Sequence, residues 1–95
     1  MPEMRFVIRW PDGAIESCYS PSLVIKDFFS PGLSYSLEDF VTSARDALTI
    51  ASDRVAARYG FPCSRALGQL ARIEAVAAQF GGAPEARVVV ESFEE

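Results

Sequence analysis

A chain of 95 residues, 49% of them hydrophobic, can bury one core, so we expect a single domain covering residues 1–95. The net charge of −4 and the scattered basic residues disfavour nucleic acid as a partner, and no apolar run approaches the roughly 20 residues of a membrane span. The sequence has no histidine, and its two cysteines alone cannot build a zinc site, so we expect no metal and no cofactor.

The first 19 residues predict a β-hairpin. Residues 4–10 alternate apolar and polar side chains, residues 11–13 (Pro-Asp-Gly) have turn chemistry, and residues 14–19 predict the returning strand. The turn residues suit a three-residue loop with a glycine bulge. A second register, in which Trp10 pairs with Gly13, better separates the apolar residues from the charged ones on the two faces of the hairpin. We favour this second register. It places Glu16 beside the arginines of one face and gathers these residues on the other: Phe6, Ile8, Trp10, Ile15 and Tyr19.

Residues 20–33 form the least regular stretch of the sequence. The Ser-Pro pair at 20–21 offers an N-cap and a first helical residue, and the Pro-Gly pair at 31–32 predicts a turn. We expect a loop with at most one helical turn, in which the two phenylalanines at 28–29 plug the edge of the core.

A long helix is predicted over residues 37–59. Ser36 and Asp39 resemble a capping box at its start, Gly60 offers a left-handed cap at its end, and Pro62 blocks its continuation. Apolar residues recur at steps of three and four to form one stripe: Leu37, Phe40, Val41, Ala44, Leu48, Ala51, Val55 and Tyr59.

The last third of the chain predicts a second helix and a strand. The helix runs from Cys63 or Ser64 to Gln79 and is ended by the glycines at 81–82, before a loop at 83–85. The strand runs from 87 to 93 around three valines. The order β-β-α-α-β indicates an α+β fold, with a three-stranded antiparallel sheet and two helices packed on one face.

The sequence gives no reason to assign a catalytic, cofactor-binding or metal-binding residue. The serines lack a histidine base, and the paired carboxylates lie at a helix start and in the C-terminal tail, where solvation is their expected role. Cys63 lies at a predicted helix start, which can lower the pKa of a thiol, but a buried and inert cysteine is the favoured interpretation. We therefore expect no enzymatic activity.

Basic residues are the candidate contacts to an anion or to an acidic partner. Arg54 and Arg58 are four residues apart near a helix end, where they could hold an anion between them or simply interact with the helix dipole. Arg5 and Arg9 share a strand face, where Glu16 could pair with them. The full set of candidate contacts is Arg5, Arg9, Lys26, Arg54 and Arg58.

Three apolar residues are candidates for a subunit interface: Val7, Ile50 and Val89. Ile50 lies off the main stripe of its helix, and the two valines lie on strand faces that helices packed on one side leave open. Exposed apolar clusters mark interfaces, and a small chain enlarges its core by burying them between subunits. We therefore expect a homo-oligomer.

Several sequence blocks occur in one order along nearly the whole chain: Arg5-Phe6, Arg9-Trp10-Pro11-Asp12-Gly13, Cys18-Tyr19-Ser20-Pro21-Ser22, Val24-Ile25-Lys26-Asp27, Ala47-Leu48-Thr49-Ile50-Ala51-Ser52, Tyr59-Gly60-Phe61 and Ser92-Phe93-Glu94-Glu95. Together they resemble the small bacterial nitrogen-starvation response proteins encoded in nitrilase-containing gene clusters. The resemblance implies an induced cytoplasmic protein that acts near enzymes of nitrile or related nitrogen metabolism. It implies no particular site residue.

Two functions follow as the main hypotheses, and a cofactor-free enzyme is a third that the missing acid–base groups disfavour. The first is a non-catalytic interaction or regulatory module, homo-oligomeric, that assists the nitrilase-cluster enzymes. The second is a sensor that binds a small anionic metabolite through the arginines. A module should bury a large apolar interface of at least about 1,000 Å², whereas a sensor should show a concave site where several arginines converge. The N-terminal residues lack the apolar stretch of a signal peptide, which agrees with a cytoplasmic location.

Overall fold

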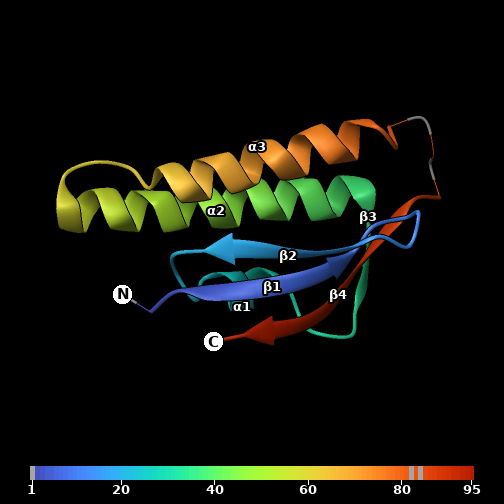
Figure 1. The fold of residues 1–95 in the computed structure, drawn as a ribbon, viewed down its shortest axis with the longest axis horizontal. Coiled ribbons are helices and arrows are strands. Elements are labelled where there is room, and N and C mark those ends of the chain that lie inside the picture. The colour runs from blue at the N-terminus through green and yellow to red at the C-terminus, as the bar shows by residue number, and fades with distance from the viewer. Residues whose placement is uncertain (1, 82, 84) are drawn as a thin grey trace.

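The computed structural model describes residues 2–81, 83 and 85–95, and it has an α+β fold. Its strands form one antiparallel sheet in the order β2-β1-β4-β3, and the two long helices cover one face of this sheet (Figure 1). The elements are β1 (Met4–Arg9), β2 (Ile15–Ser20), α1 (Ile25–Phe28), β3 (Ser34–Ser36), α2 (Leu37–Tyr59), α3 (Ser64–Ala78) and β4 (Arg87–Glu94). The predicted α+β class is confirmed. Of the residues predicted to follow the second helix, Gly82 and Pro84 lie outside the described residues.

The prediction of three strands is wrong, because β3 adds a fourth strand at the edge of the sheet. Ser34 pairs with Val89, and Ser36 pairs with Arg87. The Ser-Tyr-Ser segment is short and mostly polar, so it forms a strand by pairing with β4 and not through an apolar pattern of its own. Ser36 is also the N-cap of α2, where its Oγ accepts a hydrogen bond from the Asp39 N–H at 3.1 Å. The predicted helix start is therefore confirmed.

The register that we favoured for the hairpin is wrong by one residue. The Trp10 N–H donates to the Ala14 carbonyl at 2.8 Å, and Gly13 has a φ of +90°, so the strands are joined by the three-residue loop. Ile15 pairs with Arg9, which places it on the face of the sheet away from the helices, where it is 53% exposed.

Glu16 takes the place on the helix-facing side that the sequence pattern gave to an apolar residue. It pairs with Ile8, and its carboxylate accepts hydrogen bonds from the Trp10 indole at 3.1 Å and from the Arg72 guanidinium at 3.2 Å. A carboxylate tolerates this position because two donors compensate for its lost water. The alternation of apolar and polar residues predicted the wrong register because it contains no information on Arg72, which lies 56 residues from Glu16 in the sequence.

Residues 20–33 contain the single helical turn that the sequence allowed, but the turn lies at α1 (Ile25–Phe28) and does not begin at Ser20. Ser20 and Ser22 instead hold the preceding chain in a tight turn. The Ser22 N–H donates to Ser20 Oγ at 3.2 Å, and Ser20 Oγ donates to the Ser22 carbonyl at 2.7 Å. This turn brings Ser22 to α2, as the site below requires.

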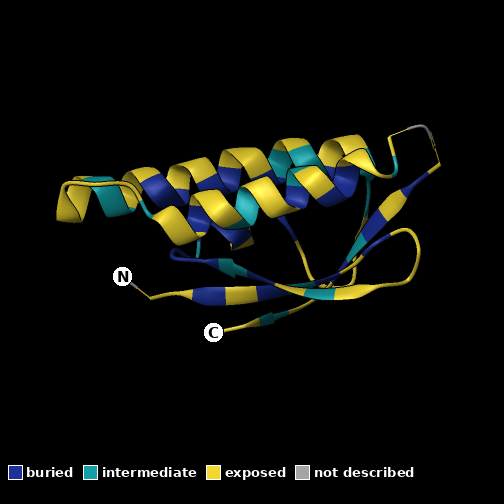
Figure 2. Cartoon of the chain, turned by 45° about the horizontal axis from the view of Figure 1, so that its top comes forward, coloured by how far each residue is buried: buried dark blue, intermediate teal, exposed yellow. Residues whose placement is uncertain are grey.

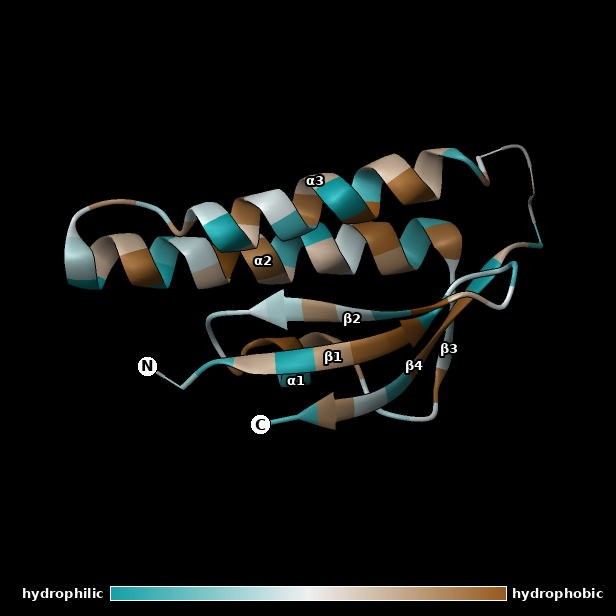
Figure 3. Cartoon of the chain, in the orientation of Figure 1, coloured by the Kyte–Doolittle hydropathy of each residue, from teal (hydrophilic) through white to brown (hydrophobic). Residues whose placement is uncertain are grey.

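The core lies between the sheet and the two helices, whose buried residues recur along the sides that meet each other and the strands (Figure 2). Phe40 is fully buried at its centre, with ring centroids 5.8 Å from Trp10 and 5.2 Å from Phe29. Burying aromatic side chains of this size contributes most of the apolar area that stabilises a small domain. Hydrophobic residues are spread over all elements (Figure 3), and no described helix is long and apolar enough to cross a membrane.

The last turns of α2 extend beyond the ends of the strands (Figure 1). Gly60 ends the helix at a φ of +88°, with its N–H bonded to the Ala56 carbonyl at 2.8 Å, as its position in the sequence predicts. Pro2 lies near this overhanging end, where it lines a pocket together with residues of these turns. Side chains of these helix turns therefore face loops and not the sheet.

Candidate anion-binding site

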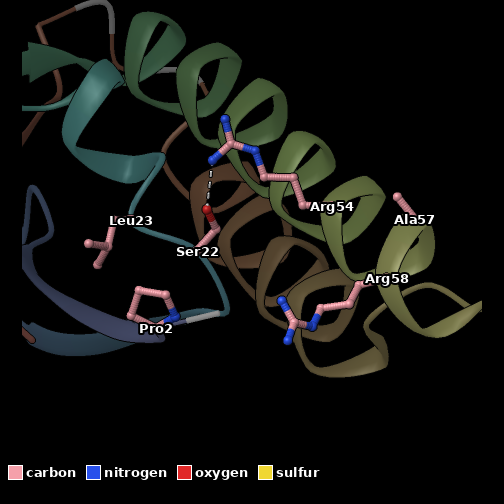
Figure 4. A pocket seen from close by; sticks show the side chains of 6 residues that line it. All are labelled: Pro2, Ser22, Leu23, Arg54, Ala57 and Arg58. Carbon is pink, nitrogen blue, oxygen red and sulfur yellow. Dashed lines mark hydrogen bonds between the residues drawn. The ribbon is translucent and has the colours of Figure 1, made fainter.

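A pocket of about 520 Å³ lies beneath the overhanging end of α2 (Figure 4). Three segments build it: the N-terminal residues, the turn before α1, and the last turns of α2. Its lining residues are Pro2, Ser22, Leu23, Arg54, Ala57 and Arg58. We call this site the arginine pocket. Its walls combine two cations and one hydroxyl group with small or apolar side chains.

Ser22 is the fixed polar group of the arginine pocket. The residue is only 4% exposed, and its Oγ accepts hydrogen bonds from the Val24 N–H at 3.3 Å and from Arg54 Nη1 at 2.9 Å (Figure 4). Because the turn from Ser20 to Val24 is closed by its own hydrogen bonds, the hydroxyl stays in one place. The bond from Arg54 holds one guanidinium group at the pocket wall.

Arg54 and Arg58 are adjacent on one face of α2, and both guanidinium groups extend to the side of the helix where Ser22 and Pro2 lie (Figure 4). Neither forms an ion pair with a described residue. The Arg58 guanidinium lies 5.7 Å from the ring centroid of Tyr59. Arg58 is also in the last turn of the helix, where a cation interacts favourably with the helix dipole. Both roles that the sequence allowed for this pair are compatible with the geometry.

Two other basic candidates, Arg9 and Lys26, do not line this pocket and are paired with carboxylates. Arg9 Nε donates to Glu91 at 2.9 Å, so the acid beside it comes from β4 and is not Glu16 as the predicted register implied. Lys26 Nζ donates to Glu95 at 2.9 Å. The structure thus brings together Arg54 and Arg58 and separates them from the remaining candidates.

Arg5 belongs to a second, smaller pocket of about 330 Å³, lined by Glu3, Met4, Arg5, Tyr19, Arg65, Glu94 and Glu95. There the Arg65 guanidinium lies 3.8 Å from the ring centroid of Tyr19, and the Tyr19 hydroxyl donates to Glu3 at 3.0 Å. Partial burial and the bond to Glu3 raise the pKa of Tyr19. Charges of both signs line this pocket and are close enough to compensate one another, so it presents no concentrated positive charge to an anion.

The interface candidates do not form one surface. Val7 and Val89 are half-buried on the open face of the sheet, whereas Ile50 lies on α2, which covers the opposite face. Ile15 joins the two valines, because it and Val89 flank Arg9 from the two neighbouring strands. The open face therefore has a small apolar area around the stem of Arg9.

The two cysteines are free thiols in different surroundings. Cys18 is fully buried in the core, and burial, with a smaller contribution from Glu16, raises the pKa of its thiol to about 12. Cys63 is half-buried and is the N-cap residue of α3, where its side chain makes no capping hydrogen bond. Its N–H donates to Ser52 Oγ at 3.2 Å. No group of three or more potential metal ligands is found among residues 2–81, 83 and 85–95.

Sequence reasoning missed four of the six residues that line the arginine pocket: Pro2, Ser22, Leu23 and Ala57. A signal for Ser22 was present, because two serines spaced two apart around a proline favour a turn closed by their hydroxyl groups. The contact from this turn to Arg54 spans 32 residues of sequence, and no local pattern reports such a contact.

The fold and the site define a small α+β domain that carries an amphiphilic, positively charged pocket. The family model described as nitrogen starvation-induced protein NitG matches residues 5–93, and the chain belongs to this family. The resemblance to nitrogen-starvation response proteins is thereby confirmed, whereas a link to nitrilase gene clusters stays a prediction. Neither a curated protein nor a solved structure matches the chain.

Proposed function

We propose that this member of the nitrogen starvation-induced family is a non-catalytic, cytoplasmic module that binds a small anionic metabolite in the arginine pocket. The observation that carries the proposal is that Arg54, Arg58 and the Ser22 hydroxyl all line one cavity, where Arg54 is bonded to Ser22 (Figure 4). Guanidinium groups are suited to carboxylates and phosphates because they present several N–H donors in a fixed plane.

The non-catalytic part of the proposal rests on the chemistry of the pocket wall. Its described polar groups are two guanidinium groups and one hydroxyl, which are donors to an anion. General acid–base catalysis needs a group that exchanges a proton near neutral pH, and an arginine stays protonated there. Such a wall is suited to holding a ligand and reporting its presence.

Thermal unfolding of the purified protein, with a panel of small carboxylates and phosphates, tests this function. A ligand at ten times its Kd stabilises the native state by about 1.4 kcal/mol, which raises Tm by roughly 5–10 °C in a domain of this size. The double variant R54Q/R58Q should lose that rise. Arg45→Gln is the matched control, because Arg45 lies on the same helix but pairs with Glu74 at 2.8 Å. If no anion raises Tm, or if R54Q/R58Q responds as the parent does, the proposed function is wrong.

A second candidate function is self-association or partner binding through the open face of the sheet. The observation in its favour is the apolar area of Val7, Ile15 and Val89, in which Ile15 is 53% exposed. Sedimentation of the parent and of Ile15→Lys distinguishes the cases, since a dimer through this face should dissociate in the variant. Affinity purification from nitrogen-starved cells would show whether pathway enzymes bind. A monomeric protein that returns alone would leave the arginine pocket as the only supported candidate.

A further inference from the structure

We propose that the ligand of the arginine pocket is a small monocarboxylate, held head-first by Ser22 and Arg54 beside the second positive charge of Arg58, with its apolar remainder against Leu23 and Ala57. The inference rests on the proposed function and names the class of metabolite. Three observations support this inference: the Ser22 hydroxyl has a hydrogen left to donate, the pocket lies at the C-terminal end of α2, and part of the pocket wall is apolar.

The Ser22 hydroxyl has one hydrogen still to donate. A hydroxyl group has two lone pairs and one hydrogen, and both hydrogen bonds that Ser22 Oγ makes to described residues are accepted ones, from Val24 and Arg54. The residue is only 4% exposed and lines the pocket, so this hydrogen is donated to solvent in the free pocket, and a ligand that displaces the solvent has to accept it. The head of the ligand is therefore an acceptor, as an ionised carboxylate is.

The position of the pocket disfavours a phosphate. Arg54 and Arg58 lie in the last two turns of α2, whose C-terminal end carries a partial negative charge of about 0.5 from the helix dipole. Sites for phosphate commonly use the opposite, N-terminal end of a helix, where backbone N–H groups and the dipole both attract the anion. The helix end therefore lowers the positive potential of the two guanidinium groups and provides no backbone N–H donors, so the pocket lacks two features that favour a phosphate.

The remaining wall is suited to a short hydrocarbon group. Pro2, Leu23 and Ala57 contribute only carbon atoms from their side chains, and they share the cavity with the arginines. Ala57 lies between the two arginines in sequence, and its methyl group leaves room that a longer side chain would fill. A purely polar anion would leave this part of the wall in contact with water, so apolar substituents on the carboxylate should increase affinity.

Titration of the full chain with acetate, propionate, butyrate, succinate and inorganic phosphate, followed by heteronuclear NMR, tests the inference. Affinity should rise from acetate to butyrate by about two- to fourfold per added methylene, the upper value corresponding to full burial of a CH₂ group. Butyrate should bind at least tenfold more tightly than succinate or phosphate. Equal or tighter binding of phosphate or succinate would overturn the monocarboxylate assignment while leaving the anion-binding function intact.

Two variants separate the head group from the tail. Ser22→Ala should lower butyrate affinity by about tenfold or more, the usual effect of losing one hydrogen bond to a charged group. Ala57→Leu, on the solvent-exposed side of α2, should lower butyrate affinity to the level of acetate and change acetate affinity less than twofold. Because Ala57→Leu alters no buried position, it decides the question even if Ser22→Ala fails to fold. Unchanged butyrate binding by Ala57→Leu would refute the apolar subsite, whereas absence of all anion binding in the parent would refute the proposed function as well.

Discussion

Burial of Cys18 should make the native protein sensitive to alkaline pH. The thiol is fully buried, and its pKa rises from an ordinary 9.0 to about 12, mainly because burial disfavours the thiolate and secondly because Glu16 lies near. In the unfolded chain the same thiol ionises near its ordinary pKa. Between these two values the native state binds more protons than the unfolded state, so the free energy of unfolding falls as pH increases.

The size of this effect follows from the two pKa values. The stabilisation that the protonated Cys18 contributes to the free energy of unfolding is fully present below pH 9. It is lost progressively between pH 9 and pH 12, the window set by the pKa values of 9.0 and about 12. At 1.36 kcal/mol per pKa unit, the loss reaches about 2 kcal/mol by pH 10.5. With a urea dependence of about 1–3 kcal/mol per molar, the midpoint of unfolding should fall by roughly 1 M from this residue alone.

The assay is urea unfolding at pH 8.0 and at pH 10.5, for the parent and for Cys18→Ala. Tyrosine, lysine and other alkaline titrations affect both proteins, so they cancel when the two pH dependences are subtracted. Cys18→Ala should be less stable than the parent at pH 8.0, because it leaves a small cavity, but it should lose about 2 kcal/mol less on going to pH 10.5. Parallel losses in the two proteins would show that Cys18 does not hold its proton through burial.

Two further predictions concern backbone conformation and the buried end of the hairpin. Gly60→Ala should destabilise the protein by about 1 kcal/mol through the φ of +88° alone, since no atom lies within 4 Å of the added Cβ. Gly68→Ala, inside α3, should instead stabilise the protein by about 0.5–1 kcal/mol. Equal effects of the two substitutions in urea unfolding would contradict this account. Glu16→Ala should cost about 1–2 kcal/mol and shift the tryptophan fluorescence, because the Trp10 indole loses its acceptor. Glu91→Ala removes the carboxylate of the exposed ion pair with Arg9 and should lower the free energy of unfolding by less than about 1 kcal/mol. A larger loss of stability in Glu91→Ala than in Glu16→Ala would refute the expectation that the Glu16 contacts contribute more.

Elements with strong local signals were predictable from the sequence. The long helix begins and ends where Ser36 and Gly60 indicate, because capping bonds and a left-handed glycine depend on neighbouring residues only. The strand β3 and the hairpin register depend on partners distant in sequence. β3 forms by pairing with β4, and Glu16 is tolerated facing the helices because of Trp10 and Arg72. Local periodicity contains neither contact, so the strand number and the register were both wrong.

The candidate site shows the same division between local and distant information. The spacing of Arg54 and Arg58 predicted that both lie on one helix face, and the structure agrees. The spacing alone could not decide whether the two side chains bind an anion or only interact with the helix dipole. Ser22 supplies the missing information, since it meets Arg54 across 32 residues of sequence and is buried with a hydrogen left to donate. Arg9 and Lys26 were equally plausible in the sequence. Only the fold shows that each already has a carboxylate partner.

A mismatch of lengths explains why the pocket lies where it does. The 23 residues of α2 span about 35 Å at 1.5 Å per residue, whereas the longest strand, with eight residues, spans about 26 Å. The last turns of α2 therefore have no strand beneath them, and the turn at Ser22 and the start of the chain supply the opposing wall (Figure 1). Residues on this overhang do not pack in the core. Arg54, Ala57 and Arg58 can therefore contact a ligand without contributing much to the stability of the fold. That separation is why substituting the two arginines should abolish binding while the protein stays folded.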